Sequence, residues 1–165
     1  MLYKDITDHD DTCAHRTYSC PFPSCELSGR LEQVCKHLID KHESATTDGE
    51  ESLLLYQDIS GYFHYLNIMR CYEHIFLVRL VKTDMIPGNQ QFMAFVQLIG
   101  SRKEALKFVY RLELNGHRSR LTFEGITRSV REDLQSAFYS KECLVFGEQF
   151  VDNGKLTIKV RISRV

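Results

Sequence analysis

The segment that most constrains the fold spans residues 18–44 and reads YSCPFPSCELSGRLEQVCKHLIDKHES. Within it, four potential metal ligands follow the spacing Cys-x4-Cys-x11-His-x4-His: Cys20, Cys25, His37 and His42. Structural zinc takes four thiolate or imidazole ligands at tetrahedral corners, which a hairpin and a helix can supply together. A segment this short buries too little apolar surface to fold alone, so bound Zn²⁺ would supply folding free energy. The spacing therefore predicts one structural zinc site, and the rival interpretation of unlinked cysteines beside surface histidines does not account for this order of ligands.

The second half of this finger is predicted to be a helix. Its apolar residues recur at helical spacing: Leu31, Val34 and Leu38. Ser28 precedes them as a candidate N-cap. His37 and His42 lie five residues apart, about 140° around an ideal helix, so the last turn must loosen for both to reach one ion. Cys35 falls on the apolar stripe and is interpreted as a small core residue rather than as a further ligand.

Composition and charge exclude several classes of protein. The chain has 165 residues, with 21 Lys and Arg against 22 Asp and Glu and a formal charge of −1. A chain this neutral has no overall attraction to nucleic acid or to an anionic membrane. No apolar run approaches the roughly 20 residues that span a bilayer, and the N-terminus lacks the apolar segment of a signal peptide. We therefore expect no nucleic-acid or membrane partner and a location in the cytoplasm or nucleus, where cysteines stay reduced.

Residues 45–165 are predicted to form a second domain after the zinc-finger region at residues 1–44. The polar segment ATTDGEE, residues 45–51, reads as the linker. Period-two patterns then indicate strands at residues 73–82 and 91–100, and a final strand with Leu156, Ile158, Val160 and Ile162 on one face. The fold class is therefore mainly β, an antiparallel β-sandwich preceded by a small zinc finger of hairpin plus short helix.

Two hairpins and two helical pieces complete the prediction for the sandwich. Asn115-Gly116 suits a type I′ turn between strands, and Asn153-Gly154 marks a second hairpin within residues 143–165. Residues 129–140 are predicted to contain one short helix, and Ser101 fits the cap of a helical turn at 101–104.

No arrangement in the sandwich indicates catalysis. Cys71 and Cys143 lie in apolar strand contexts without an evident histidine partner. His74 and His117 head strands and are interpreted as surface or core residues. We therefore expect no catalytic residue in this chain.

Several stretches together resemble one protein family. They are YSCP, HLIDKHES, QQFMAFVQLIGSRKEA, YRLELNGHRSRLTFEG, TRSV and ECLVF. These stretches are similar to the C-terminal half of the seven-in-absentia (Sina/Siah) family of ubiquitin ligases. The resemblance implies a SIAH-type zinc-finger region followed by a TRAF-like sandwich that dimerises and binds substrates. In this family an upstream RING domain recruits the ubiquitin-conjugating enzyme, and the bound target goes to the proteasome.

The resemblance also accounts for His9 and Cys13. Family members carry two adjacent fingers, and these two residues match the last two ligands of the first finger. The two preceding cysteines and the RING are not found in this sequence, so we expect an incomplete first site and no ubiquitin transfer by the chain alone. Two interpretations stay open: a substrate-recognition part of a ligase, or a ligase-dead adaptor or competitor that dimerises with full-length relatives.

The family's substrate groove is an exposed strand edge that accepts peptides of the type Pro-x-Ala-x-Val-x-Pro by strand addition. The resemblance implies that seven residues line it here: Thr46, Glu51, Leu53, Leu54, Phe63, Tyr65 and Asn67. Asn67 replaces a methionine of the family, so apolar contacts weaken and a polar group must be satisfied. We expect either altered peptide specificity or a groove that is no longer used.

Overall fold

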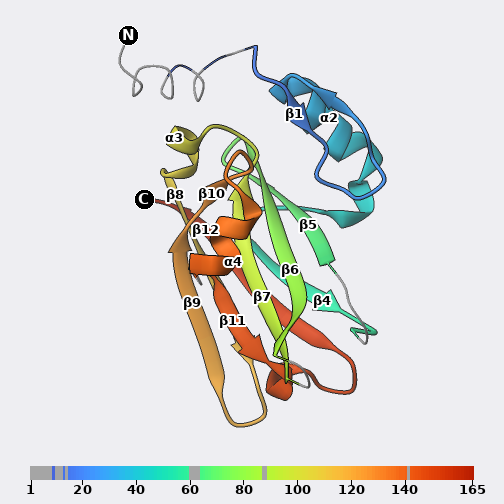
Figure 1. Cartoon of the computed structure of the whole chain (residues 1–165), viewed down its shortest axis with the longest axis vertical. Coiled ribbons are helices and arrows are strands. Elements are labelled where there is room, and N and C mark those ends of the chain that lie inside the picture. Colours follow the sequence, from blue (N-terminus) through green and yellow to red (C-terminus); the bar gives the residue numbers. More distant parts are fainter. Residues whose placement is uncertain (1–8, 10–12, 14, 60–63, 87–88, 141) are drawn as a thin grey trace.

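A computed structural model describes residues 9, 13, 15–59, 64–86, 89–140 and 142–165 of the chain (Figure 1). The strands are β1 Tyr18–Ser19, β2 Ser28–Gly29, β3 Thr46–Asp48, β4 Glu51–Tyr56, β5 His64–Cys71, β6 His74–Ile86, β7 Asn89–Leu98, β8 Phe108–Asn115, β9 Arg120–Ile126, β10 Arg128–Ser129, β11 Leu144–Gly147 and β12 Leu156–Arg164. The α-helices are α2 Leu31–Lys41, α3 Arg102–Ala105 and α4 Leu134–Ser140, and short 3₁₀ turns are η1 Glu43–Ala45 and η2 Glu148–Phe150. None of the described helices is long and apolar enough to cross a membrane.

Two sheets pack face to face, as the predicted sandwich requires. The larger sheet has the order β10-β7-β6-β5-β3, with β11 also paired to β7, and the smaller has the order β4-β12-β8-β9. Pairing is antiparallel except between β3 and β5 and between β10 and β7. The alternation in β12 is confirmed, because Leu156, Ile158, Val160 and Ile162 are all buried between the sheets while the residues between them face outward. The mainly β fold class is therefore confirmed.

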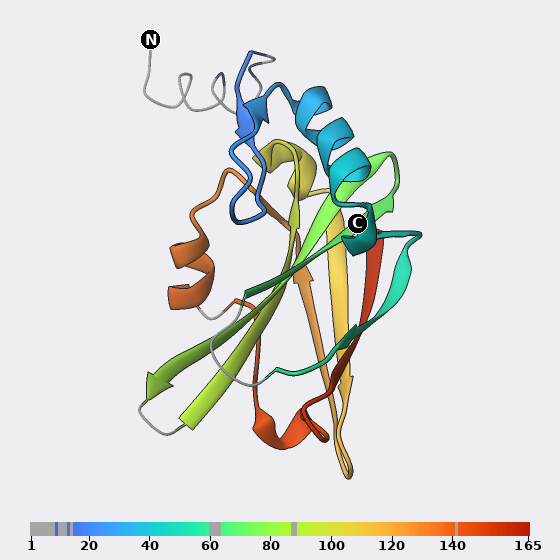
Figure 2. The same ribbon diagram turned by 90° about the vertical axis from the view of Figure 1, so that its right-hand side faces the viewer.

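The zinc finger packs against the outer face of the larger sheet. Val34 and Leu38 of α2 are fully buried and form one apolar cluster with residues of three strand regions that include Ile68, Leu77 and Ile99. A separate, larger cluster fills the space between the two sheets. The finger thus lies at the end of the sandwich opposite the β8–β9 loop, and it shares a core with the sheet although it is formed by a different part of the sequence (Figures 1 and 2).

The predicted β8–β9 hairpin is confirmed by its antiparallel pairing, but its turn and the second predicted hairpin need correction. The β8–β9 connection spans residues 116–119 instead of a two-residue type I′ turn, and the Gly116 N–H closes it by donating to Ser119 O at 2.7 Å. Asn153 and Gly154 do form a tight turn, with φ of 49° and 73°. However, β11 and β12 on either side of it belong to different sheets, so they make no hairpin. The side-chain alternation is the same in both arrangements, and the sheet assignment of β11 depends on its long-range pairing with β7.

The helices also differ in detail from the prediction. The N-cap of α2 is Arg30, because Ser28 lies in β2; the Arg30 N–H donates to the Gln33 side chain at 2.9 Å. The predicted helix at residues 129–140 is shorter, since its first residues form β10 and a turn. The cap by Ser101 is confirmed, with the Glu104 N–H donating to its Oγ at 3.1 Å.

Candidate metal centre and peptide edge

The two cysteine ligands are held by the hairpin of the finger. Cys20 follows β1, and its N–H donates to Leu27 O at 2.8 Å across the hairpin. The Cys25 N–H donates to Phe22 O at 3.3 Å, which closes the turn between the cysteines. Ser24 adopts a φ of 66° in this turn, a left-handed conformation that short polar residues tolerate better than branched ones. Local hydrogen bonds therefore aim both thiols at one point.

The two histidine ligands come from the end of α2. His37 lies within the helix, whereas His42 follows its last residue and has a non-helical backbone with φ −120° and ψ 33°. The His42 N–H still donates to Leu38 O at 3.0 Å. The prediction that the last turn must loosen is confirmed, because His42 leaves the helical path immediately after Lys41.

The four side chains form a cluster that suits zinc. Their ligand atoms all lie within 4.8 Å of one another. Cys20 Sγ lies 3.5 Å from His42 Nε2, and Cys25 Sγ lies 3.1 Å from His37 Nε2. A tetrahedral site with Zn–S bonds of about 2.3 Å and Zn–N bonds of about 2.0 Å separates sulfur from nitrogen by about 3.5 Å. The donor set and its spacing therefore fit a structural Zn²⁺.

The surroundings of the cluster fix its ligands. The Phe22 ring stacks on the His42 ring, with centroids 3.9 Å apart and planes 4° from parallel. Burial raises the pKa of the Cys20 thiol and lowers the pKa of His42. The lowered pKa keeps His42 neutral and able to bind metal, whereas the raised thiol pKa means that a cation is needed to stabilise the Cys20 thiolate.

The residues predicted for peptide binding lie near one open edge of the sandwich, which we call the peptide edge (residues 46–56 and 64–67). Strand β4 ends the smaller sheet and pairs with β12 only, among the described strands. Strand β3 covers β5 only at residues 68–70, so the side of residues 64–67 that faces away from β6 has no described strand neighbour. Figure 2 shows β4 crossing beside this part of the larger sheet.

Part of the peptide edge points between the two sheets. The Tyr56 hydroxyl of β4 donates to Asn67 Oδ1 of β5 at 2.9 Å, and the Tyr56 and Tyr65 rings lie 5.2 Å apart. Leu54 is buried in the main core. Asn67 therefore has the hydrogen-bond partner that its polar side chain requires, and Tyr56 is a residue of this edge that the sequence reasoning missed.

The other members lie elsewhere on the same edge. Leu53 faces outward and is 69 % exposed, and Glu51 Oε1 lies 3.4 Å from Lys159 Nζ on that outer face. The Thr46 hydroxyl donates to His42 O at 3.0 Å, beside the finger. Phe63 lies outside the described residues. The structure thus distributes the set over two faces, and its role in peptide binding stays a prediction.

Comparison with known protein families shows to which family the chain belongs. A family model described as "Sina, TRAF-like domain" matches residues 69–161, and a model described as "Sina, zinc finger" matches residues 1–54. This chain belongs to the Sina family. It is 46 % identical over 174 residues to the E3 ubiquitin-protein ligase sina of Drosophila melanogaster, a match that covers 100 % of this chain and 55 % of the fly protein.

Two further Sina relatives show similar agreement. The chain is 45 % identical to the E3 ubiquitin-protein ligase sina of Schistosoma mansoni, covering 99 % of this chain and 46 % of the fluke protein. It is 44 % identical to the human E3 ubiquitin-protein ligase SIAH2, covering 99 % of this chain and 53 % of the human protein. The chain spans about half the length of the curated relatives it matches.

The remaining predicted ligands stay apart from the zinc cluster. In the described part of the chain, His9 is exposed, Cys13 is partly buried, and neither joins a group of metal-binding side chains. Cys35 packs against the apolar cluster of the finger, and burial raises the pKa of its thiol to about 11. This supports the interpretation of Cys35 as a small core residue, since a thiol with this pKa is protonated at neutral pH.

Proposed function

We propose that this chain is the substrate-recognition and dimerisation module of a Sina-type ubiquitin-protein ligase that directs bound proteins to ubiquitination and proteasomal degradation. Membership of a family whose members are named E3 ubiquitin-protein ligases supports this proposal. The finger would hold one Zn²⁺ through Cys20, Cys25, His37 and His42 and so order the face of the sheet that it covers. The module would act in the cytoplasm or nucleus, where its cysteines stay reduced.

The observation that carries the proposal is the open peptide edge. Backbone groups of residues 64–67 face a side of β5 that has no described strand neighbour. An extended peptide added there would gain main-chain hydrogen bonds, while side chains such as Tyr65 and Asn67 would set specificity. Asn67 stands where the family has a methionine, and its Oδ1 already accepts from the Tyr56 hydroxyl. Its amide NH₂ group would therefore favour a hydrogen-bond acceptor at the matching peptide position.

A fluorescence titration of the zinc-loaded chain with a labelled Pro-x-Ala-x-Val-x-Pro peptide tests this mode of binding. We expect saturable binding that Tyr65→Ala weakens by roughly ten-fold or more, since buried aromatic contacts dominate such interfaces. Tyr139→Ala is the matched control, because Tyr139 is 79 % exposed on α4 and outside the peptide edge.

N-methylated versions of the peptide test strand addition itself. Methylation at alternate residues should abolish binding in one register and leave it intact in the other, because only every second N–H of an added strand faces the edge. Equal binding of both methylated peptides, or no binding of any peptide by the folded protein, would refute the proposed mode.

Dimerisation is tested separately by sedimentation equilibrium of the zinc-loaded chain. We expect a mass of twice the 19.3 kDa chain at micromolar concentration. A monomer at all concentrations would remove dimerisation from the proposal and leave peptide binding to be judged by its own titration.

A further inference from the structure

A cavity of about 310 Å³ lies where the zinc finger meets the sandwich. Three arginines from separate parts of the chain line it: Arg16 before β1, Arg79 on β6 and Arg131 after β10. Hydroxyl groups of Thr17 and Ser19 also border it, and no carboxylate is among its described lining residues. Folding therefore gathers positive charge and hydrogen-bond donors around one space.

Arg79 is the most informative of these residues, because it is only 6 % exposed and has no acidic partner among the described residues. Its Nε donates to Gln97 Oε1, and its Nη1 lies 3.2 Å from His64 Nε2. Gln97 in turn donates to Ser129 O. No ion pair links Arg79 to a carboxylate in the described part of the chain. Burying a charge without an opposite charge is costly, so this guanidinium favours an anion from outside.

Arg79 remains a cation at neutral pH. Desolvation lowers its pKa, but only to about 10. Partial desolvation is the larger cause that lowers the pKa of His64, and the charge of Arg79 is the smaller one. This imidazole is therefore neutral at neutral pH and accepts the hydrogen bond from Arg79. The contacts of Arg79 satisfy its N–H groups in part and leave its charge uncompensated.

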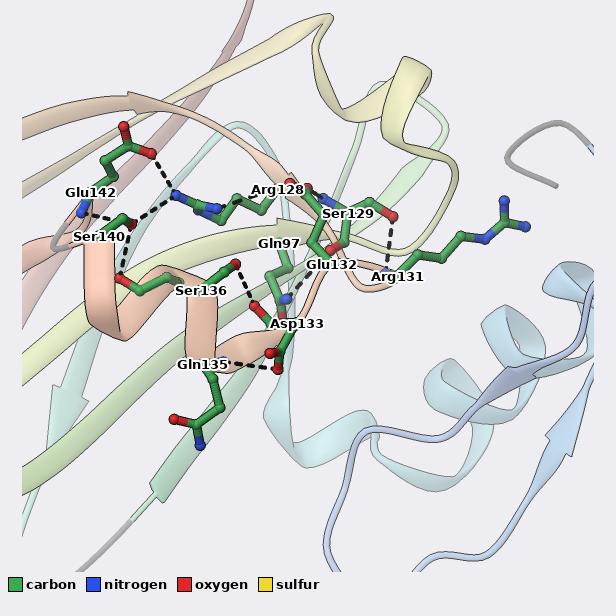
Figure 3. A network of polar contacts seen from close by, with 11 residues as sticks. Gln97, Arg128, Ser129, Arg131, Glu132, Asp133, Gln135, Ser136, Ser140 and Glu142 are labelled. Atoms are coloured by element: carbon green, nitrogen blue, oxygen red, sulfur yellow. Dashed lines mark hydrogen bonds and ion pairs between the residues drawn. The ribbon is translucent and has the colours of Figure 1, made fainter. Parts of the chain in front are cut away.

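Arg128, unlike Arg79, lies beside carboxylates. The Arg128 guanidinium lies 2.7 Å from Glu142 Oε2 and 3.9 Å from Glu132 Oε1, so acidic neighbours compensate its charge. Arg131 points away from this acidic cluster and toward the finger, as Figure 3 shows, and its guanidinium lies 4.6 Å from the centroid of the Tyr18 ring. The polar network around Arg128 reaches the cavity through uncharged groups, because Gln97 donates to Ser129 O and the Arg131 backbone N–H donates to Ser129 Oγ. Its carboxylates, Glu132 and Glu142, are not among the described residues that line the cavity.

The zinc centre does not neutralise the cavity either. Two cysteine thiolates balance the charge of Zn²⁺, and the two neutral histidines add none. An adjoining cavity of about 450 Å³ shares Arg16 and Arg131 and adds Lys103 and Lys107, against Glu104 as its acidic lining residue. Basic side chains therefore outnumber acidic ones among the described residues that line the two cavities, although the chain carries a formal charge of −1.

We propose that the junction of finger and sandwich binds an oxyanion of the phosphate type, either free or as a phosphoryl group on a side chain of a protein partner. The planar guanidinium of arginine matches two oxygens of such a group at once. A dianionic phosphate compensates more of the gathered charge than a single carboxylate does. Because Arg16 and Arg131 come from different modules, a bound anion would also fasten the finger to the sandwich.

Isothermal titration of the zinc-loaded chain at constant ionic strength tests the proposal. The probes are inorganic phosphate, N-acetyl-O-phosphoserine amide and, as a monoanion control, acetate. We expect binding of at least one phosphate probe and much weaker binding of acetate. Binding of inorganic phosphate alone assigns the site to the free ion, and binding of the phosphoserine derivative assigns it to phosphorylated side chains. Zinc content is measured before and after, so that loss of metal to phosphate is not mistaken for binding.

Variants identify the site within the chain. Arg79→Met should weaken phosphate binding by roughly 10- to 100-fold, because a charge-assisted hydrogen bond is lost. The double variant Arg16→Gln/Arg131→Gln alters less buried residues and keeps the test valid if Arg79→Met fails to fold. Arg161→Gln is the matched control on the exposed outer face of β12. No phosphate binding by the wild-type chain, or equal affinities in wild type and double variant, would overturn the proposal.

Discussion

Replacing two cysteines of the same finger separates the metal ligands from the core. We expect Cys25→Ser to lose zinc and to unfold residues 18–42, whereas Cys35→Ser keeps both. Cys25 lies 3.1 Å from His37 Nε2 within the ligand cluster, while Cys35 stands outside that cluster on the same finger. The two variants make the same chemical change at partly buried positions, so they form a matched pair.

The structure sets the size of the expected effect. Within the finger, Val34 and Leu38 are fully buried, and burying two such side chains contributes about 3–6 kcal/mol. Structural zinc sites bind their ion with an apparent free energy of about 10–16 kcal/mol at neutral pH. The metal is therefore the larger stabilising contribution, and apolar packing on the sheet does not hold the finger in place without it. The main core between the sheets is a separate cluster and should survive metal loss.

Hydrogen exchange read by mass spectrometry, together with zinc content, measures this outcome. In Cys25→Ser, amide protection should fall to that of an unfolded chain over residues 18–42 and persist in β8 and β12. In Cys35→Ser, zinc content should stay at one ion per chain, with a stability change of about 1 kcal/mol. Full protection of residues 18–42 in zinc-free Cys25→Ser, or collapse of the whole sandwich, would refute the reasoning.

Three further predictions concern the sandwich. Asn67→Leu should lower the free energy of unfolding by about 1–3 kcal/mol, because it removes the acceptor of the Tyr56 hydroxyl. Urea unfolding of this variant, of Tyr56→Phe and of the double variant should show that the two losses are coupled. Strictly additive losses would contradict the hydrogen bond. Ile158→Ala should lower the free energy of unfolding by about 2–5 kcal/mol, since Ile158 is fully buried. Lys159→Ala, on the opposite face of β12, is the control. Similar urea midpoints for the two variants would be inconsistent with the assigned faces. Desolvation, and secondly the charge of Arg79, lowers the pKa of His64 in the folded chain from its ordinary 6.5. The unfolded chain therefore binds a proton at His64 more readily than the folded chain does. The contribution of neutral His64 to folding stability is full above pH 6.5 and is lost as the pH falls through the lowered pKa of the folded state. His64→Gln should reduce the loss of stability between pH 7 and pH 5, and an unchanged loss would disprove the assignment.

The sequence by itself determined the local features of this protein. Ligand spacing identified Cys20, Cys25, His37 and His42, because a zinc finger brings its ligands together through one hairpin and one helix that follow each other in the chain. The alternation in β12 identified its buried face, because side chains of a strand point to opposite sides in turn. The need for a loosened turn before His42 followed from helical geometry alone.

Only the tertiary structure decided which distant segments meet. Strands β11 and β12 flank a tight turn at Asn153-Gly154 yet join different sheets, a choice that depends on long-range pairing and not on local sequence. The hydrogen-bond donor to Asn67, the Tyr56 hydroxyl, comes from a strand of the other sheet. The three arginines at the junction are more than 50 residues apart in sequence from one to the next, and their shared cavity arises because the finger packs on the outer face of the larger sheet. Charge gathered in this way has no signature in the overall composition, since it is the fold that brings the side chains into one place.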